Sequence, residues 1–336
     1  MKFKSVFVTG GAGYIGSSLV SDLLKQGYKL TVFDIMFFGD HFLPKDNPNL
    51  KIIKGDIRNY NKMKEYTKGH DAFVNLACIS NDSSFELDEK LSKSINYDAF
   101  EPMVLAAKKS GIKRFIHAST SSVYGISNKK DVKEDHPLVP LSLYNKYKAL
   151  TEPFLLKHID ANFEGVIIRP ATVCGFAPRQ RLDLSVNILT NHAVNKSEIK
   201  IFGGEQLRPN LHIKDYCDTI SLLLKANKEK IQKQIFNVGY QNLSINDIAY
   251  LVKKVVLEEF PEKKDIKIVK SPSDDDKRSY HINSEKIKKI LGFVPSRTIE
   301  MAVKDLCNAF KNGLLSNSLT SEKYFNVKKL KSIKAT

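Results

Sequence analysis

The sequence predicts an α/β protein in which helices cover both faces of a doubly wound parallel sheet. Short runs of valine, isoleucine and phenylalanine alternate with amphipathic stretches through the first half of the chain. Such continuous apolar runs are typical of strands buried on both faces, and their alternation with helices favours parallel pairing. With 336 residues, 42% of them hydrophobic, the chain is long enough for this domain and a smaller second one.

Six strands are expected in the first half, with helices between most of them. They are expected over 5–8, 30–33, 50–53, 72–76, 114–118 and 165–168. The first helix is expected over 17–26, where leucines recur at helical spacing. Pro102 and Pro153 fall inside two further helical stretches, and each should kink its helix because it removes a backbone donor.

The regular alternation weakens in the second half, which divides the chain into three parts. The first domain should span 1–174, with one later strand over 235–238 returning to it. A smaller α/β domain should follow over 175–316. Its helices are expected over 184–195, 244–259 and 284–291. Residues 317–336 carry five lysines, one acid and few apolar side chains, so this basic tail is expected to be mobile or weakly packed.

Composition argues against several classes of protein. No apolar run reaches the ~18 residues that a membrane span needs, and the first residues enter a strand pattern directly, so no signal peptide is expected. The four cysteines are far apart and the histidines show no ligand spacing, so we expect no disulfide, no metal and a cytoplasmic location. The net charge of +16 comes from 45 lysines and 8 arginines without a dense basic patch, so no nucleic-acid partner is expected.

A glycine-rich segment follows the first predicted strand and opens the first helix. Gly10, Gly13 and Gly16 are spaced as GxxGxxG, with Tyr14 and Ile15 between the last two. Glycines permit a tight turn and close approach of the backbone to a pyrophosphate, and the helix N-terminus presents free N–H groups to the anion. The segment therefore predicts a dinucleotide site.

Asp34 ends the second predicted strand, 18 residues after Gly16. A carboxylate there accepts hydrogen bonds from ribose hydroxyls and repels a 2′-phosphate. The first arginine in the chain is Arg58, so no nearby arginine should reverse this choice. We expect NAD rather than NADP as the cofactor. Asp56, after the third strand, either contacts the adenine edge or caps the following helix.

Tyr144 and Lys148 are four residues apart, so a helix brings them to the same face. A free phenol has a pKa near 10, and a neighbouring ammonium should lower it. Such a pair can take a proton from an alcohol while hydride leaves its carbon. A hydroxyl from the segment 119–122, after the fifth strand, could orient that alcohol.

Together these features resemble the NAD-dependent sugar-nucleotide epimerase/dehydratase family, a group of extended short-chain dehydrogenases/reductases. The resemblance runs from about residue 3 to 312. Its motifs here are 9–16, Gly55-Asp56, Asn75-Leu76-Ala77, Ser119-Thr120, Val123-Tyr124-Gly125, Tyr144 with Lys148, 169–172 and 208–215. It implies a Rossmann domain, Tyr144 as base, Lys148 as its partner and ribose ligand, and Thr120 as the third catalytic hydroxyl. It also implies a homodimer.

Further site residues follow from this resemblance. The cofactor set is completed by Ile57, Leu76 and Ala77, while Asn96 matches an asparagine beside the site. The substrate should be a nucleotide-diphosphate sugar, GDP- or UDP-linked. The residues expected near it are Asn81, Asp82, Ser83, Thr120, Ser121, Arg179, Arg181, Asn187, Arg208 and Arg278. Arginine suits phosphate oxygens because its donors form a rigid fork. Arg179, Arg181, Arg208 and Arg278 are four of the five arginines, out of eight in the chain, that fall in the second domain.

The residues after Thr120 bear on the reaction. Dehydratases of this family carry Asp-Glu or Ser-Glu at the positions of Ser121 and Ser122, which cannot supply carboxylate chemistry. We therefore expect an epimerase that works through a 4-keto sugar, with a C4 dehydrogenase or 4-ketoreductase as the alternative and a 4,6-dehydratase less favoured. Outside enzymes, an NAD-sensing or RNA-binding relative of the fold is the competing interpretation.

Overall fold

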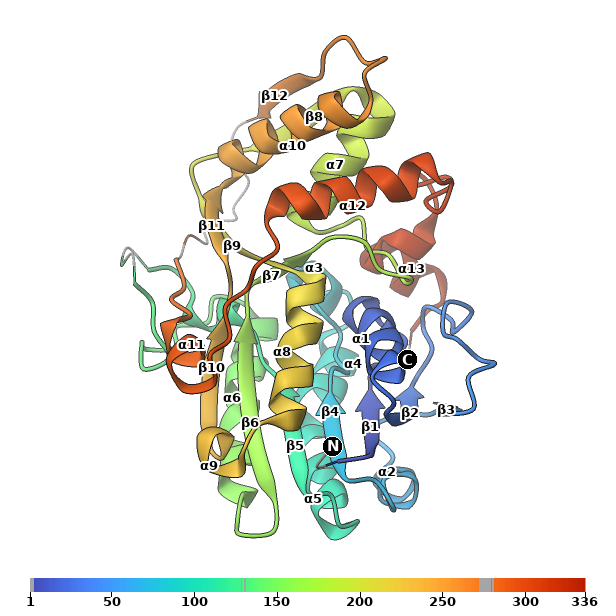
Figure 1. Ribbon diagram of the computed structural model, residues 1–336, viewed down its shortest axis with the longest axis vertical. Helices are drawn as coiled ribbons and strands as arrows, with labels where there is room; N and C mark the ends of the chain where they lie inside the picture. Colours follow the sequence, from blue (N-terminus) through green and yellow to red (C-terminus); the bar gives the residue numbers. More distant parts are fainter. Residues whose placement is uncertain (1–2, 128, 130, 272–278, 280, 336) are drawn as a thin grey trace.

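The structure is a computed structural model, and it describes residues 3–127, 129, 131–271, 279 and 281–335. Its centre is a parallel sheet of seven strands in the order β10-β6-β5-β4-β1-β2-β3 (Figure 1). The strands are β1 Ser5–Thr9, β2 Lys29–Asp34, β3 Leu50–Lys54, β4 Ala72–Asn75, β5 Arg114–Ala118, β6 Glu164–Pro170 and β10 Gln234–Val238. The predicted doubly wound parallel fold is confirmed.

Helices cover both faces of this sheet. On one face, α1 (Tyr14–Lys25) packs beside α8 (Ile213–Lys225), and their apolar side chains share a core with the strands. On the other face lie α2 (Tyr60–Tyr66), α5 (Phe100–Lys109) and α6 (Leu143–His158), over a second core. Between β1 and β4 the strand order reverses, and the crevice at such a point is where open α/β sheets bind ligands.

The two prolines affect their helices differently. Before Pro102, the chain runs through α3 (Asp82–Phe85), α4 (Glu89–Lys93) and the π-helical turn η1 (Ser94–Asp98). A wider π-turn is a known response to a missing donor and a ring that crowds the preceding turn. Around Pro153, by contrast, α6 continues from Leu143 to His158.

The second domain lies above the sheet edge in Figure 1 and has its own core. Three long helices pack together there, with two short sheets beside them. Its elements are β7 Thr172–Cys174, α7 Ser185–Lys196, β8 Glu198–Phe202, β9 Leu207–His212, β11 Gln241–Ser244, α10 Ile245–Glu259, β12 Lys267–Ser271 and α12 Ile299–Lys311. The helices α9 (Lys228–Ile231) and α11 (Glu285–Leu291) lie beside the first domain, next to β6 and β10.

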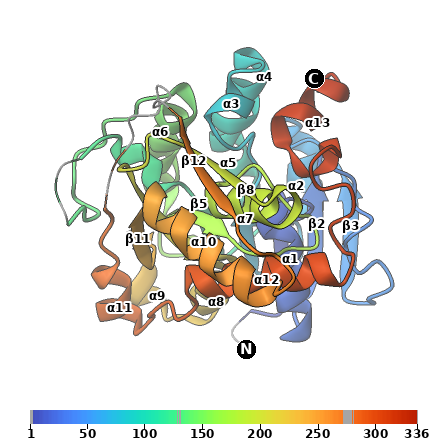
Figure 2. The ribbon, with the colours of Figure 1, turned by 90° about the horizontal axis from the view of Figure 1, so that it is seen from above.

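The described part of the basic tail is packed against the rest of the molecule. It forms η3 (Glu322–Tyr324) and α13 (Asn326–Ser332), which lies beside α3 at the same end of the molecule as the loop after β2 (Figure 2). Tyr324, Asn326 and Leu330 are buried. The expectation of a mobile or weakly packed tail is therefore wrong, because a few buried side chains anchor it despite its charge. Over the described residues, no helix is long and apolar enough to cross a membrane.

Candidate active site

A cavity of about 520 Å³ opens at the carboxyl ends of the central strands, between the sheet and the second domain. Its walls come from the loops after β1, β2, β3, β4 and β5, from α6 and from the second domain. The predicted residues that line it are Gly10, Gly13, Tyr14, Ile15, Gly16, Asp34, Asp56, Ile57, Leu76, Ala77, Asn81, Asp82, Ser83, Thr120, Tyr144, Lys148, Arg179, Arg181 and Arg208.

The glycine loop has the close packing that a dinucleotide site needs. Gly10 has a positive φ of 73°, and a Cβ there would lie 2.6 Å from the backbone nitrogen of Ala77. A Cβ at Gly16 would lie 2.2 Å from the Gly10 carbonyl oxygen. Gly13 begins α1 without a side-chain cap, so the N–H groups of the first turn are left for an anion. These residues fit the diphosphate of NAD.

Asp34 lies at the end of β2, facing the glycine loop. Its Oδ2 accepts a hydrogen bond from the Ala12 N–H at 3.0 Å and its Oδ1 accepts from the Met36 N–H at 2.8 Å. Burial raises the pKa of Asp34, while these two N–H groups oppose the rise. Arg179 also lowers this pKa, so an arginine does lie near Asp34. The sequence argument that none is near was wrong, since the second domain supplies it.

Asp56 does not cap a helix. The cap of α2 is Asn59, whose side chain accepts from the Lys62 N–H. Asp56 instead pairs with Arg58, with Oδ2 2.5 Å from Nη2, and lines the cavity beside Ile57. Of the two alternatives for Asp56, the structure rules out the helix cap.

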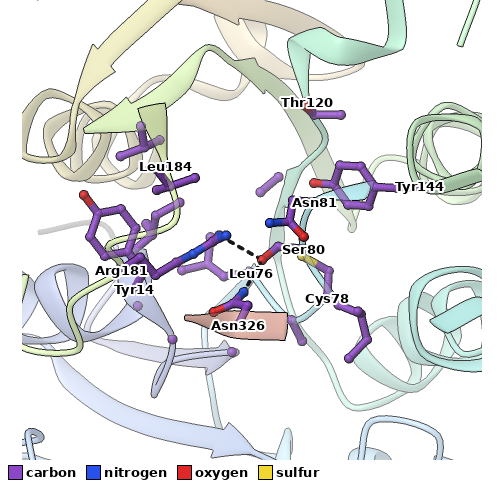
Figure 3. Close-up of a pocket in the computed structure, with 18 of the residues that line it drawn as sticks. Tyr14, Leu76, Cys78, Ser80, Asn81, Thr120, Tyr144, Arg181, Leu184 and Asn326 are labelled. Atoms are coloured by element: carbon purple, nitrogen blue, oxygen red, sulfur yellow. Dashed lines mark hydrogen bonds between the residues drawn. The ribbon is translucent and has the colours of Figure 1, made fainter. Parts of the chain in front are cut away.

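Tyr144, Lys148 and Thr120 line the same cavity, and Figure 3 shows Tyr144 and Thr120 on the side away from Arg181. Tyr144 lies in the first turn of α6, and its hydroxyl points toward Asn81. Lys148 is buried one turn later, and its Nζ donates to the Ala118 carbonyl oxygen at 2.8 Å. The Thr120 and Ser122 hydroxyl oxygens lie 2.9 Å apart. The helix and the end of β5 thus bring the predicted catalytic groups together.

The pKa of Tyr144 differs from the expectation. Burial raises it well above its usual value, and the neighbouring Cys78 and Asp82 add to the rise, while Arg181 opposes it. The Lys148 ammonium is not among the groups that shift it most. In this structure the lowered phenol pKa that the sequence predicted is therefore absent.

On the opposite side of the cavity, Arg181 is the central group. Its Nε lies 2.8 Å from Asp183 Oδ1, and its Nη1 donates to the Ser80 Oγ at 3.0 Å. Figure 3 shows the Arg181 guanidinium and the Asn326 side chain both reaching Ser80. Arg208 lines the cavity from β9, where its Nη1 donates to the Leu207 carbonyl oxygen.

Two predicted residues lie away from the cavity wall. Ser121 is buried, and its hydroxyl has no hydrogen-bond partner in the part of the chain that the structure describes, while its neighbour Ser122 lines the cavity instead. Asn187 is fully buried: its Nδ2 donates to the Tyr14 hydroxyl oxygen at 3.1 Å, and its Oδ1 accepts from the Gly175 N–H at 3.0 Å. Both predictions are corrected, because these side chains serve the packing around the site. Arg278 lies outside the described residues.

Several wall residues were missed by the sequence analysis. Ser80, Phe38, Tyr216, Asn326 and Leu330 all line the cavity. Asn326 and Leu330 are buried. They were missed because the five lysines of residues 317–336 indicated that this segment would be exposed to solvent. Phe38 and Ser80 follow β2 and β4 closely, so their positions after strand ends were a usable signal.

No group of three or more His, Cys, Asp or Glu side chains that could hold a metal is found among the described residues. The four cysteines, Cys78, Cys174, Cys217 and Cys307, are free thiols.

Comparison with known proteins agrees with this geometry. The model of the NAD dependent epimerase/dehydratase family matches residues 6–239. The chain belongs to this family, and NAD is its cofactor. Membership of this family explains the fold and the residues that fit a dinucleotide. It does not identify the reaction, because the reaction differs among members of the family.

Relatives with different activities are about equally similar. A UDP-glucose 4-epimerase from Lacticaseibacillus casei is 27% identical over 314 residues, which cover 87% of this chain and 92% of the relative. A dTDP-glucose 4,6-dehydratase from Streptomyces niveus is 26% identical over 250 residues, covering 70% and 72%. A solved UDP-N-acetylglucosamine 4-epimerase from Methanobrevibacter ruminantium has a TM-score of 0.83 at 24% identity, covering 93% of this chain and 100% of that chain.

Proposed function

We propose that this chain is an NAD-dependent sugar-nucleotide epimerase that acts through a 4-keto sugar. The observation that carries the proposal is the meeting of Tyr144, Lys148 and Thr120 at a cavity that also holds the glycine loop. The 4-epimerases among its relatives support it, including the enzyme that was solved with UDP-N-acetylmuramic acid. Similar identity to a dehydratase means that the reaction must be argued from the site itself.

When bound, NAD would accept a hydride from C4 of the sugar and return it to the other face. In this proposal Tyr144 takes the proton from the C4 hydroxyl and later gives it back. Lys148 donates one N–H to Ala118 and has two further donors for a ribose hydroxyl and for the phenolate. Thr120 orients the sugar hydroxyl from the end of β5.

The positively charged side of the cavity suits the substrate diphosphate. Arg208 lines this wall from β9, and a rigid guanidinium fork matches phosphate oxygens. Asn81 lies between Tyr144 and Arg181 in Figure 3, within reach of a sugar that spans the two. Arg278, which the sequence analysis placed at the diphosphate, stays part of the proposal. The substrate is then a UDP- or GDP-linked sugar.

The dehydratase alternative is weakened by the groups beside Thr120. Elimination of water needs an acid and a base near C5 and C6 of the sugar. Ser122 supplies a hydroxyl at that point, and Ser121 is turned away from the cavity. The neighbourhood of Thr120 therefore favours hydride return over elimination.

We also propose a cytoplasmic homodimer, formed through η1, α5 and α6. Leu150 on α6 is 41% exposed. An aromatic cluster joins Tyr97 of η1 to Tyr147 and Phe154 of α6. A second copy would cover these side chains. The free thiols suit a reducing compartment.

The test is incubation of the purified chain and NAD with UDP-glucose, UDP-N-acetylglucosamine and GDP-mannose, followed by mass spectrometry and NMR. A product of unchanged mass with inverted C4 is expected. Loss of one water from the product mass would contradict the epimerase and support dehydration. Stoichiometric NADH would support the C4 dehydrogenase.

Tyr144→Phe tests the same site. Turnover should fall by about 10²- to 10⁴-fold, because proton transfer loses its group, while NAD binding measured by calorimetry stays unchanged. Tyr147→Phe is the matched control, since this half-buried phenol lies on the same helix and does not line the cavity. Equal turnover of the two variants would remove Tyr144 from its proposed role.

A further inference from the structure

The tail contributes a polar side chain to the cavity through Asn326, the first residue of α13. Its backbone N–H donates to Asp183 Oδ2 at 2.8 Å, and its Nδ2 donates to Ser80 Oγ at 3.1 Å. Its Oδ1 accepts from Arg179 Nη2 at 2.6 Å. Asn326 is 4% exposed and lines the same cavity as the glycine loop.

Arg179 is a buried cation that two acidic neighbours, Asp34 and Asp183, compensate only in part. It is 4% exposed, and no ion pair to it is found within the part of the chain that the structure describes. Its Nε has no hydrogen-bond partner among the described residues. Burial lowers the pKa of Arg179 to about 9, and the charge of Arg181 adds to the lowering, while Asp183 and Asp34 oppose it. A buried charge that is only partly compensated is costly, so an anionic ligand beside it would be favoured.

The position of Arg179 identifies which anion this is. Its backbone N–H donates to the Ser17 Oγ at 3.1 Å, in the first turn of α1. Its guanidinium stacks on the Phe38 ring, with the Cζ 3.6 Å from the ring centre. Asp34, the proposed ribose ligand, shifts the pKa of Arg179 as a near neighbour. These groups lie where the glycine loop and Asp34 would hold the adenosine and diphosphate half of a dinucleotide.

The rest of α13 covers the same half of the cleft. Leu330 lines the cavity and packs in one apolar cluster with Ile57, Phe37 and Phe38. Ile57 is an expected cofactor residue and follows Asp56, for which contact with the adenine edge was expected. The helix therefore lies across the end of the cleft that would hold adenosine, away from Tyr144 and Thr120.

We infer that α13 completes the cofactor site, with Arg179 and Asn326 binding the dinucleotide diphosphate and Leu330 covering the adenosine. This inference rests on the proposed function, in so far as that function requires NAD in this cleft. It adds a cofactor ligand from the end of the chain, beyond the residues 6–239 that the family model matches. The anion compensates Arg179, and Asn326 orients the guanidinium toward it.

Asn326→Asp separates a binding role from a structural one. The carboxylate keeps the size of Asn326 and its Oδ1 acceptor for Arg179. Its second oxygen can accept from the Ser80 hydroxyl in place of the Nδ2 donor. A purely structural role therefore predicts equal or greater stability. A carboxylate beside a diphosphate repels it, so a binding role predicts weaker binding of diphosphates alone. Lys331→Ala, an exposed residue on the same helix, is the matched control.

The experiment is calorimetric titration of the full chain and its variants with NAD, ADP and adenosine, together with urea unfolding. For Asn326→Asp we expect the dissociation constants of NAD and ADP to rise about ten- to hundredfold, because the new carboxylate repels the diphosphate. The dissociation constant of adenosine and the unfolding midpoint should stay as in the wild type. Lys331→Ala should change none of them.

Unchanged NAD and ADP binding by Asn326→Asp would overturn the inference, and so would an equal loss for adenosine and ADP. Arg179→Gln provides a second test, because it removes the positive charge that would bind the diphosphate. This variant must also bind ADP more weakly than the wild type while its dissociation constant for adenosine stays unchanged. Wild-type chain that binds none of the three ligands would overturn the proposed function as well. Wild-type binding with unaffected variants would overturn the inference alone.

Discussion

Tyr144 lies among groups that keep its proton in place. Burial, Cys78 and Asp82 all raise the pKa of its phenol, and Arg181 alone among the strongest neighbours lowers it. A base whose proton is held this firmly acts better as pH rises, because a larger fraction is deprotonated. Individual charges around the phenol should therefore move the pH dependence of turnover.

Asp82→Asn should shift that dependence to lower pH. Removing a negative charge beside the phenol lowers the pKa of Tyr144, so the acidic limb of kcat/KM for sugar oxidation should move down by about 0.5–1 pH unit. The asparagine oxygen can still accept from the Ser142 hydroxyl, which Asp82 does here. The measurement is kcat/KM between pH 6 and 10.

Asp88→Asn is the control for this prediction. Asp88 caps α4 by accepting from the Leu91 N–H at 2.9 Å, and asparagine caps helices equally well. Its acidic limb should coincide with that of the wild type. An upward shift in Asp82→Asn, or no shift, would show that Asp82 does not act on the phenol.

The π-turn η1 links a proline to the cavity wall at the scale of one element. It carries Asn96, whose Oδ1 accepts from the Ile79 N–H at 2.8 Å and whose Nδ2 donates to the Ile79 carbonyl at 2.9 Å. Ile79 follows β4 and lines the cavity. The irregular turn just before Pro102 therefore holds the loop that carries Ser80 and Asn81.

Asn96→Ala should destabilise the protein by about 2–4 kcal/mol, because it leaves two buried backbone groups of Ile79 without partners. It should also raise KM for the sugar nucleotide, since the Ser80–Asn81 loop loses its support. Urea unfolding and initial-rate kinetics measure the two effects. Asn308→Ala, at an exposed position of α12, should stay within about 0.5 kcal/mol of the wild type. Equal unfolding midpoints would contradict the role of Asn96.

At the scale of the whole molecule, several buried acids hold their protons in the folded state. Burial raises the pKa of Cys174 and of Cys307 to about 12, and it raises the pKa of Cys217 as well. The phenols of Tyr14 and Tyr216 are shifted upward for the same reason. Each such group stabilises the fold fully below its unfolded pKa and loses that contribution as pH rises toward its folded pKa.

The free energy of unfolding should therefore begin to fall above about pH 9, where unfolded thiols ionise. Each buried thiol adds up to about 1.4 kcal/mol per pH unit to the slope. Urea unfolding at pH 8, 9, 10 and 11 measures it, and Cys307→Ala should show a shallower decline than the wild type. A midpoint that stays constant to pH 11 would contradict these shifts.

The central strands were predictable because runs such as Val6–Val8 in β1 and Val166–Ile168 in β6 are continuously apolar, and burial on both faces leaves little choice of residue. The glycine loop, Asp34, Tyr144 and Lys148 were predictable because their chemistry depends on spacing within one strand–turn–helix unit or one helix turn. The approach of Arg179 to Asp34 was not, since it depends on how the second domain folds back. The packing of Asn326 was missed because the lysines around it predicted an exposed segment. The two positions that are buried there, Asn326 and Leu330, do not form an apolar pattern that could be recognised in the sequence.

The outermost strand, β10, has a consequence for how the protein is made. It pairs with β6 from beyond the cap segments, and α8, which covers one face of the sheet beside α1, also comes after residue 174. During synthesis, β6 emerges from the ribosome with one edge unpaired. That edge stays unpaired until the chain has been made as far as Val238, the last residue of β10. A nascent chain that stalls between these points exposes an apolar sheet, so chaperones have a defined window in which to hold it.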